Sequence, residues 1–192
     1  MGRTTGRSPE DTRRLVLDAA AREICRDGIR TSLDAIAQRA GVSKGGLIYH
    51  FPNKEALHRA LVQQEVDEWR ELVEREVDPE ERGPGRLIRA YVRASLAPFD
   101  GADVRERFRL FAQLSTVPAA VRAAEEDEAR WQRELEADGV PQATRVLVVA
   151  AADGACGPPL LGSALPDEVR ERLKADLLAL VDAAVGAPVR AG

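Results

Sequence analysis

The chain has 192 residues, a mass of 20.9 kDa and a formal net charge of −4, and this length is sufficient to bury a hydrophobic core in one or two domains. Its 44% hydrophobic and 31% charged residues are typical of a soluble globular protein that is neither disordered nor membranous. No stretch approaches the about 18 apolar residues of a membrane span, the polar N-terminus is unlike a signal peptide, and two cysteines and two histidines cannot form a disulfide framework or a His-rich metal site. We therefore expect a cytoplasmic protein that contacts no membrane and needs no metal or other cofactor.

The charge is distributed unevenly along the chain. Residues 1–58 carry 10 basic and 7 acidic side chains, a net charge of +3, whereas residues 59–192 carry 18 and 25, a net charge of −7. A basic segment attached to an acidic one is the pattern expected if only the N-terminal part contacts a polyanion. Charged faces that are merely solvated explain the same numbers, so the charge alone leaves both interpretations open.

Helices are expected along the whole chain, because apolar residues recur at steps of three and four and no β-branched stretches are joined by hairpin turns. The first four predicted helices cover about residues 9–27, 33–40, 44–51 and 54–77. Each follows a side chain that can cap a helix N-terminus, namely Ser8, Thr31 or Ser32, Ser43, and Asn53. Pro9 suits a first helical position, and Gly28 suits the end of the first helix.

Five further helices are predicted beyond a loop at residues 78–84. They cover about residues 85–97, 103–115, 118–138, 142–156 and 166–185, with proline or glycine between them. Gly157-Pro158-Pro159 is expected to break or kink the eighth helix. The sequence thus predicts an all-α protein of about nine helices, in which a basic head of three helices is joined through a long fourth helix to an acidic helical body.

The strongest local signal is the segment SLDAIAQRAGVSKGGLIYHF at residues 32–51. Two short helices that meet at a three-residue turn need a small residue on the first helix, a glycine in the turn and an apolar anchor on the second. Ala37, Gly41 and Leu47 have this spacing. It is typical of a DNA-binding helix-turn-helix, whose second helix enters the major groove. A plain helical hairpin is the alternative that the spacing leaves open.

Residues 9–60 resemble the TetR family of bacterial transcriptional repressors. The residues that carry the resemblance are Thr31, Ile36-Ala37, Ala40-Gly41-Val42-Ser43, Leu47, Tyr49-His50-Phe51, Lys54 and Leu57. The resemblance implies a DNA-binding domain at residues 9–60 and a helical ligand-binding and dimerisation domain at residues 61–187. It also implies three partners, which are a double-stranded DNA operator, an unidentified small-molecule effector and a second copy of the chain.

The resemblance further implies which residues contact DNA. They are Thr31, Ser32, Ser43, Lys44, Gly45, Gly46, Tyr49, His50 and Lys54. Hydroxyls and amides at the helix starts, together with the ammonium of Lys54, would hold phosphates, and Lys44 would reach a guanine edge or the backbone. Tyr49 and His50 would contact phosphates or a thymine methyl. The alternatives are that Tyr49 packs beneath Phe51 and that the two lysines are merely solvated.

The predicted recognition helix departs from the family pattern at Gly46, where the family often has threonine or serine, and Gly45 precedes it. Each glycine lowers helix propensity by roughly 0.8–1.0 kcal/mol relative to alanine. Our hypothesis is that this helix frays without DNA and that the missing side chains let its backbone approach the groove closely. The missing hydroxyl also removes one candidate for base readout.

Aromatic side chains on several helices of the acidic body are candidates for an effector pocket. They are Trp69, Tyr91, Phe108, Phe111 and Trp131. Such residues form core more often than pocket, but the resemblance implies a small-molecule site in this domain. Glu128 and Asp153 interrupt apolar stretches and join the candidates, because a buried carboxylate needs a partner. An internal arginine is favoured as that partner, since the chain has 25 arginines, and a cationic ligand is the alternative.

The stretch at residues 146–152 is apolar on every side and must therefore be covered on both. We expect it to form, with the last helix, a four-helix bundle across a twofold axis. The candidate interface residues are Val146, Val149, Leu173, Leu177, Leu180, Val181 and Ala184. Two DNA-binding heads about 34–36 Å apart would then read successive major grooves of a palindrome.

The sequence thus predicts a homodimeric repressor that a small molecule releases from a palindromic operator. A helical interaction module without operator specificity is the first alternative. An enzyme is the second and is disfavoured, because Glu55 and His58 form one Glu-x-x-His motif but His50 is the other histidine of the chain, so the second motif of a di-iron bundle cannot exist. No phosphate-binding glycine loop or nucleophile motif occurs either, and no catalytic residue is expected.

Overall fold

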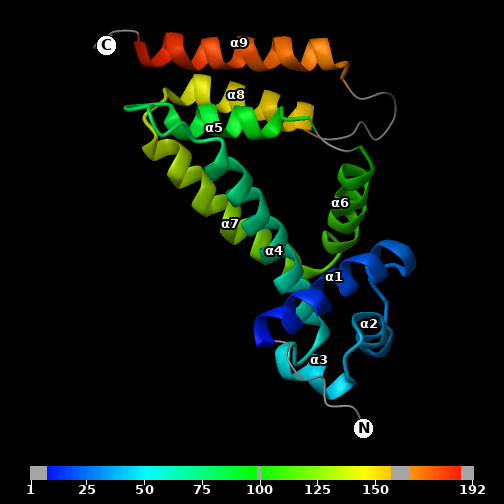
Figure 1. The fold of residues 1–192 in the computed structure, drawn as a ribbon. Helices are drawn as coiled ribbons and strands as arrows, with labels where there is room; N and C mark the ends of the chain where they lie inside the picture. Colours follow the sequence, from blue (N-terminus) through cyan, green and yellow to red (C-terminus); the bar gives the residue numbers. More distant parts are fainter. Residues whose placement is uncertain (1–7, 99–100, 157–164, 187–192) are drawn as a thin grey trace. The chain divides into compact units, whose positions relative to one another are not determined.

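The computed structural model describes residues 8–98, 101–156 and 165–186, and this part of the chain is helical without strands (Figure 1). Its helices are α1 (Pro9–Asp27), α2 (Leu33–Ala40), α3 (Lys44–His50), α4 (Lys54–Arg75), α5 (Arg86–Ser95), α6 (Gly101–Leu114), α7 (Pro118–Ala137), α8 (Gln142–Cys156) and α9 (Asp167–Gly186). Each lies where a helix is predicted, which confirms the all-α fold. Gly157-Pro158-Pro159 lies outside the described residues. None of the described helices is long and apolar enough to cross a membrane.

The helix ends confirm the predicted capping. The Ser8 hydroxyl accepts a hydrogen bond from the Asp11 amide at 3.0 Å, and the Asp11 carboxylate accepts one from the Ser8 amide at 3.2 Å, which makes a reciprocal capping box. The side chains of Ser32 and Asn53 each accept from the amide three residues on, at 3.1 and 2.8 Å. These bonds satisfy backbone donors that a helix start leaves unpaired, so short sequence patterns fix where α1, α2 and α4 begin.

Internal contacts divide the chain into two compact units. Unit 1 consists of Met1–Val66 and Glu106–Glu125, and unit 2 consists of Asp67–Arg105 and Glu126–Gly192. Because these boundaries fall inside α4 and α7, each of those helices contributes to both units.

The core of unit 1 joins α1, α2, α3 and the first part of α4 to α6. Its buried side chains include Val16, Ala20, Ile24, Ile36, Leu47, Phe51, Leu57, Leu61, Leu110 and Leu114. Polar contacts also hold α6 in this unit, since the Ile29 amide donates to the Gln113 side chain at 3.1 Å and Arg107 pairs with Glu65 at 2.9 Å. The segment 106–125 therefore packs with the N-terminal helices, and the expected domain boundary after residue 60 stays a prediction.

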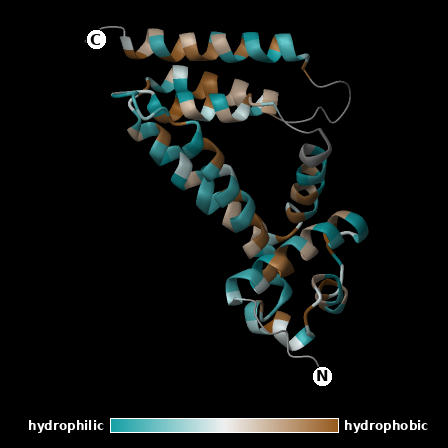
Figure 2. Cartoon of the chain, viewed as in Figure 1, coloured by the Kyte–Doolittle hydropathy of each residue, from teal (hydrophilic) through white to brown (hydrophobic). Residues whose placement is uncertain are grey.

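The core of unit 2 lies where α5 packs against α8 and α9. Its buried side chains include Val73, Ile88, Tyr91, Val92, Leu96, Trp131, Leu135, Val148, Ala152, Leu177 and Val181. Hydrophobic and hydrophilic residues alternate around the helices of both units (Figure 2), as expected for helices that bury one face.

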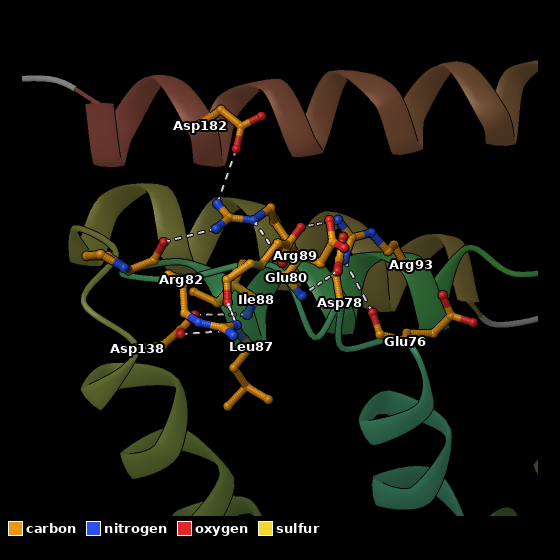
Figure 3. A network of polar contacts seen from close by, with 12 residues as sticks. Glu76, Asp78, Glu80, Arg82, Leu87, Ile88, Arg89, Arg93, Asp138 and Asp182 are labelled. Atoms are coloured by element: carbon orange, nitrogen blue, oxygen red, sulfur yellow. Dashed lines mark hydrogen bonds and ion pairs between the residues drawn. The ribbon is translucent and has the colours of Figure 1, made fainter.

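A polar network at the start of α5 connects several segments of unit 2 (Figure 3). Gly85 precedes α5 and has no capping side chain, but the Asp138 carboxylate accepts hydrogen bonds from two amides in the first turn of α5, at 3.0 and 2.9 Å. Arg89 of α5 pairs with Asp182 of α9 at 3.1 Å and with Glu81 at 3.4 Å. Residues distant in sequence therefore cap α5 and attach it to α9.

Candidate DNA-binding face and ligand site

The turn between α2 and α3 has helix-turn-helix geometry. Gly41 ends α2 in the left-handed conformation, with φ 65° and ψ 34°, which glycine adopts without strain. The Val42 amide then donates to the Ala37 carbonyl at 3.0 Å. Ile36, Ala37 and Leu47 are buried in the core of unit 1. The structure confirms that the spacing of this segment produces two helices in close contact.

One face of α3 is open to solvent. Leu47 is fully buried, whereas Tyr49 is 82% exposed. The exposed residues of α3 are Lys44, Gly45, Ile48 and Tyr49. Because Phe51 is buried and Tyr49 is not, the alternative in which Tyr49 packs beneath Phe51 is wrong. Sequence reasoning missed Ile48, which is 40% exposed although it follows the buried Leu47 on the same helix.

The first turn of α3 is held by side-chain contacts. The Ser43 hydroxyl accepts a hydrogen bond from the Gly46 amide at 3.0 Å and so caps the helix. The Lys44 ammonium pairs with Asp34 of α2 at 2.9 Å, and both side chains are exposed. An exposed pair of this kind contributes little free energy, so Lys44 is able to exchange Asp34 for another anion.

The other predicted DNA contacts lie in unit 1, either in α3 itself or in the segments before α2 and at the start of α4. Ser32 is exposed. The half-buried ones are Thr31, Gly46, His50 and Lys54. The Lys54 ammonium donates to the Arg30 carbonyl at 3.0 Å, which ties the start of α4 to the loop before α2. Lys44 and Lys54 therefore both have protein partners and are not merely solvated, while the contact of each residue with DNA stays a prediction.

A buried ion cluster that sequence reasoning missed holds α2 against α1. Glu23 of α1 is buried, and its carboxylate is bound by Arg26 at 2.6 Å and by Arg39 of α2. Two guanidinium groups compensate a charge that would otherwise be costly to bury. The available sequence signal is a glutamate beside Ile24 on the apolar face of the predicted first helix.

Three predicted effector residues meet in unit 2 as an aromatic cluster, defined as Trp69 of α4, Tyr91 of α5 and Trp131 of α7. The ring centroids of Trp69 and Tyr91 are 5.6 Å apart in an edge-to-face arrangement, and those of Tyr91 and Trp131 are 5.7 Å apart. The Tyr91 hydroxyl donates a hydrogen bond to the carboxylate of Asp153 on α8. Four of the seven predicted effector residues are therefore brought together.

Arg70 lies beside the aromatic cluster and was not predicted. Its guanidinium carbon is 4.5 Å from the centroid of the Trp131 ring, within the range of a cation–π interaction. The same group pairs with Asp127 at 2.9 Å and with Glu134 at 2.7 Å. Arg70 therefore connects α4 to α7, and among so many arginines its sequence position gave no signal of this role.

The partner of Asp153 is a hydroxyl group, so the expected internal arginine is wrong for this carboxylate. Burial raises the pKa of Asp153 above its ordinary value, the hydrogen bond from Tyr91 lowers it in part, and the negative charge of Glu128 raises it again. Asp153 as a whole residue is exposed on α8. Its carboxylate, however, contacts the hydroxyl of the buried Tyr91 and loses water there. Burial, followed by the contact with Asp153, also raises the pKa of Tyr91, which keeps its hydroxyl a donor.

Glu128 is exposed, and its carboxylate accepts a hydrogen bond from Gln132 at 2.6 Å, so its expected burial is wrong. The inward face of α7 passes through Ala123, Asp127 and Trp131, so Asp127 lies where Glu128 was expected. The acids of α7 that meet the internal Arg70 are therefore Asp127 and Glu134.

The two phenylalanines predicted to contact the effector lie outside unit 2. Phe108 and Phe111 belong to the part of α6 in unit 1, where both are exposed while Leu110 and Leu114 of the same helix are buried. Their contact with an effector stays a prediction.

The predicted dimer residues fall into two groups. Those exposed or half-buried are Val146, Val149, Leu173, Leu180 and Ala184. Leu177 and Val181 are instead buried within the chain, because α9 packs on α5 and α8. Their assignment to a dimer interface is corrected to the core of unit 2, since a side chain covered by its own chain cannot contact a second copy.

Family models match both parts of the chain. Residues 16–61 match the model described as "Bacterial regulatory proteins, tetR family", and residues 85–182 match the one described as "Tetracyclin repressor-like, C-terminal domain". Among curated proteins, the transcriptional regulator RutR of Escherichia coli K12 is 37% identical over 113 residues, which cover 57% of this chain and 51% of RutR. The chain thus spans about half the length of the curated relatives it matches first.

Solved structures of other proteins have a fold similar to that of this chain. The multidrug binding protein EbrR complexed with malachite green is 27% identical, with a TM-score of 0.64 over 88% of this chain and 97% of EbrR. A transcriptional regulator from Rhodococcus sp. Rha1 has a TM-score of 0.65 at 24% identity, over 95% of this chain and all of that chain, and supports the fold alone. Because the C-terminal family model by itself covers more than half of the sequence, this chain belongs to the TetR family of bacterial transcriptional regulators.

Proposed function

We propose that this TetR-family chain is a cytoplasmic, homodimeric repressor that binds a palindromic DNA operator through α3 and leaves it when a small molecule binds unit 2. The observation that carries the proposal is the division of α3 into a buried side at Leu47 and an open side at Lys44, Ile48 and Tyr49. A helix anchored on one side and open on the other is what insertion into a major groove requires.

The chemistry of the open side suits DNA. The Lys44 ammonium would exchange Asp34 for a guanine edge or a phosphate. Tyr49 offers an apolar ring with a hydroxyl, and Ile48 offers a branched apolar side chain for a thymine methyl. Gly45 carries no side chain, so the first turn of α3 could bring its backbone amides close to a phosphate.

The effector would bind at the aromatic cluster and act through α4. This helix carries Leu57 and Leu61 in the core of unit 1 and Trp69 and Arg70 beside the cluster in unit 2. A ligand that displaces Trp69 therefore acts on the helix that also anchors the DNA-binding unit. EbrR, which has a similar fold, was solved in complex with malachite green and with ethidium, which supports small-molecule binding by this chain. Coupling of about 1–3 kcal/mol is typical of such regulation.

The second copy would pack on α8 and α9. Val146, Leu147 and Leu180 are exposed apolar residues on these helices, and pairing them across a twofold axis would remove their surfaces from water. The same axis would place two copies of α3 at half-sites one helical turn apart.

Fluorescence anisotropy on operator DNA between 50 and 200 mM salt tests the proposal. Lys44→Ala should weaken operator binding by about 1–3 kcal/mol per protomer if Lys44 reads a guanine, and should reduce the salt slope by about 1 per protomer if it holds a phosphate. The matched control is Lys174→Ala, which removes the same charge from α9, where Lys174 pairs with Glu171 at 2.7 Å. Equal binding by wild type, Lys44→Ala and Tyr49→Ala would exclude α3 as the reading helix, and binding that any DNA sequence competes away equally would favour an interaction module.

A further inference from the structure

The acidic groups around the aromatic cluster differ in how their charge is compensated. Asp127 and Glu134 pair with Arg70, and Glu134 also pairs with Arg130 at 2.8 Å. Asp153 has the neutral hydroxyl of Tyr91 as its partner. The neighbouring charge that acts on Asp153 is that of Glu128, which is also negative. One flank of the cluster is therefore neutralised by arginine, and the flank at Asp153 is not.

Two buried donors on α5 and α7, the helices that carry Tyr91 and Trp131, are also without a partner among the described residues. Trp131 is 8% exposed and its indole Nε1 has no hydrogen-bond acceptor, and Ser95, one turn after Tyr91 on α5, is 1% exposed with an unpaired hydroxyl. A buried donor left unpaired costs about 1–3 kcal/mol. These donors indicate that the cluster is built to receive a group that carries an acceptor.

The aromatic cluster already accepts a cation on its other flank. The Arg70 guanidinium stacks over the Trp131 ring at 4.5 Å, because the faces of indole and phenol rings attract positive charge. The faces of Trp69 and Tyr91 have the same property, and Asp153 supplies the counter-charge next to Tyr91. An anion would meet Asp153 and Glu128 at close range, and a neutral molecule would leave the carboxylate uncompensated.

We propose that the effector is an organic cation with an aromatic or apolar body, held by the Asp153 carboxylate and the faces of the aromatic cluster. The cation contacts the carboxylate and a ring face together, as the guanidinium of Arg70 contacts Asp127 and the Trp131 ring. An acceptor atom elsewhere on the ligand takes the Trp131 indole hydrogen. This inference rests on the proposed effector site in unit 2 and adds the chemical class of the ligand.

Intrinsic fluorescence tests the inference directly, because the two tryptophans of the chain are both members of the cluster. The probes are the cation tetraphenylphosphonium, the anion tetraphenylborate of the same shape, the neutral triphenylphosphine oxide, and the cation benzoylcholine, which also carries an ester carbonyl as an acceptor. We expect saturable quenching by at least one cation, and at least tenfold weaker binding of tetraphenylborate than of tetraphenylphosphonium. Asp153→Asn, which keeps an acceptor for Tyr91, should weaken cation binding about tenfold and leave triphenylphosphine oxide unchanged. The matched control Asp176→Asn removes an exposed charge from α9 and should change neither.

Three results would overturn the inference: no saturable binding of either cation, equal affinity for the phosphonium and the borate, or equal losses in Asp153→Asn and Asp176→Asn. If Asp153→Asn does not fold, the comparison of the charged probes on wild type decides. Anisotropy on operator DNA separates this inference from the proposed function. Operator binding without cation binding would contradict the ligand class alone, whereas cation binding by a protein with no operator would contradict the regulatory function alone.

Discussion

The two glycines of the recognition helix allow a prediction in which neighbouring positions respond differently to the same change. A methyl group added at Gly45 would have the Ser43 hydroxyl oxygen as its nearest neighbour, 4.0 Å away, whereas one added at Gly46 would lie 3.2 Å from that oxygen. The hydroxyl caps α3 by accepting from the Gly46 amide. Alanine at 45 should therefore gain helix propensity freely, and alanine at 46 should gain it while crowding the cap.

The expected magnitudes follow from these contacts. Gly45→Ala should stabilise α3 by about 0.8–1.0 kcal/mol, which corresponds to about four- to fivefold slower amide exchange in α3. Gly46→Ala should show no net gain, because a cap of this kind contributes about 1 kcal/mol. In a Ser43→Ala background, where the cap is absent, Gly46→Ala should recover the full gain, so the double-mutant cycle should give a coupling of about 1 kcal/mol.

Hydrogen exchange of the α3 amides and operator anisotropy on the same proteins form the assay. If the bare backbone at residue 45 approaches DNA, Gly45→Ala should lose operator affinity while α3 becomes more protected. An affinity that rises with protection would refute the close approach. Equal gains from Gly45→Ala and Gly46→Ala in both Ser43 backgrounds would refute the account of the cap.

Three further predictions concern unit 2. Gly85→Ala should lower the free energy of unfolding by about 1–3 kcal/mol, and by more than Gly83→Ala does. Both glycines have φ near +85°, but a methyl group at 85 would lie 2.9 Å from the Val181 side chain, whereas one at 83 would meet nothing within 4 Å. Urea unfolding measures both variants, and equal losses would contradict the packing of α5 on α9. Because the pKa of Asp153 is raised, the folded state keeps the Asp153 proton to higher pH than the unfolded state, and ionisation of Asp153 reduces stability as the pH rises through the raised pKa. Asp153→Asn should therefore melt no lower than wild type at neutral pH. Cation binding should fall as the pH is lowered through the same pKa, and an affinity independent of pH would contradict an ionised Asp153 in the site. Val146→Glu should change the stability of the chain by less than about 0.5 kcal/mol yet convert dimer to monomer in sedimentation velocity, and an unchanged dimer would move the interface elsewhere.

Local sequence signals were sufficient for much of the fold. The caps at Ser8, Ser32 and Asn53 and the small–glycine–apolar spacing of the helix-turn-helix each depend on residues within about ten positions of one another, and the structure bears them out. Helical periodicity was less exact. Glu128 was expected on the inward face of α7, but the structure has Asp127 there. Steps of three and of four residues fit the same apolar pattern equally well, so the pattern does not distinguish the two positions.

Contacts between distant segments were beyond local reasoning. The cap that Asp138 provides to α5 and the stacking of Arg70 on Trp131 join residues about 50 to 60 positions apart, and nothing near either residue in sequence marks its partner. The burial of Val181 is of the same kind. An apolar stripe predicts that a helix is covered, but the choice between its own chain and a second copy depends on the tertiary packing of α9.

The central claim is that this chain binds one DNA sequence selectively. The most direct measurement is fluorescence anisotropy of the wild-type protein on DNA from upstream of its own gene, titrated with salt and with scrambled competitor. We predict tight binding that scrambled DNA does not displace, with affinity falling linearly in a log–log plot against salt. Binding that scrambled DNA competes away equally, found again across fragments of the genome, would contradict a sequence-specific regulator.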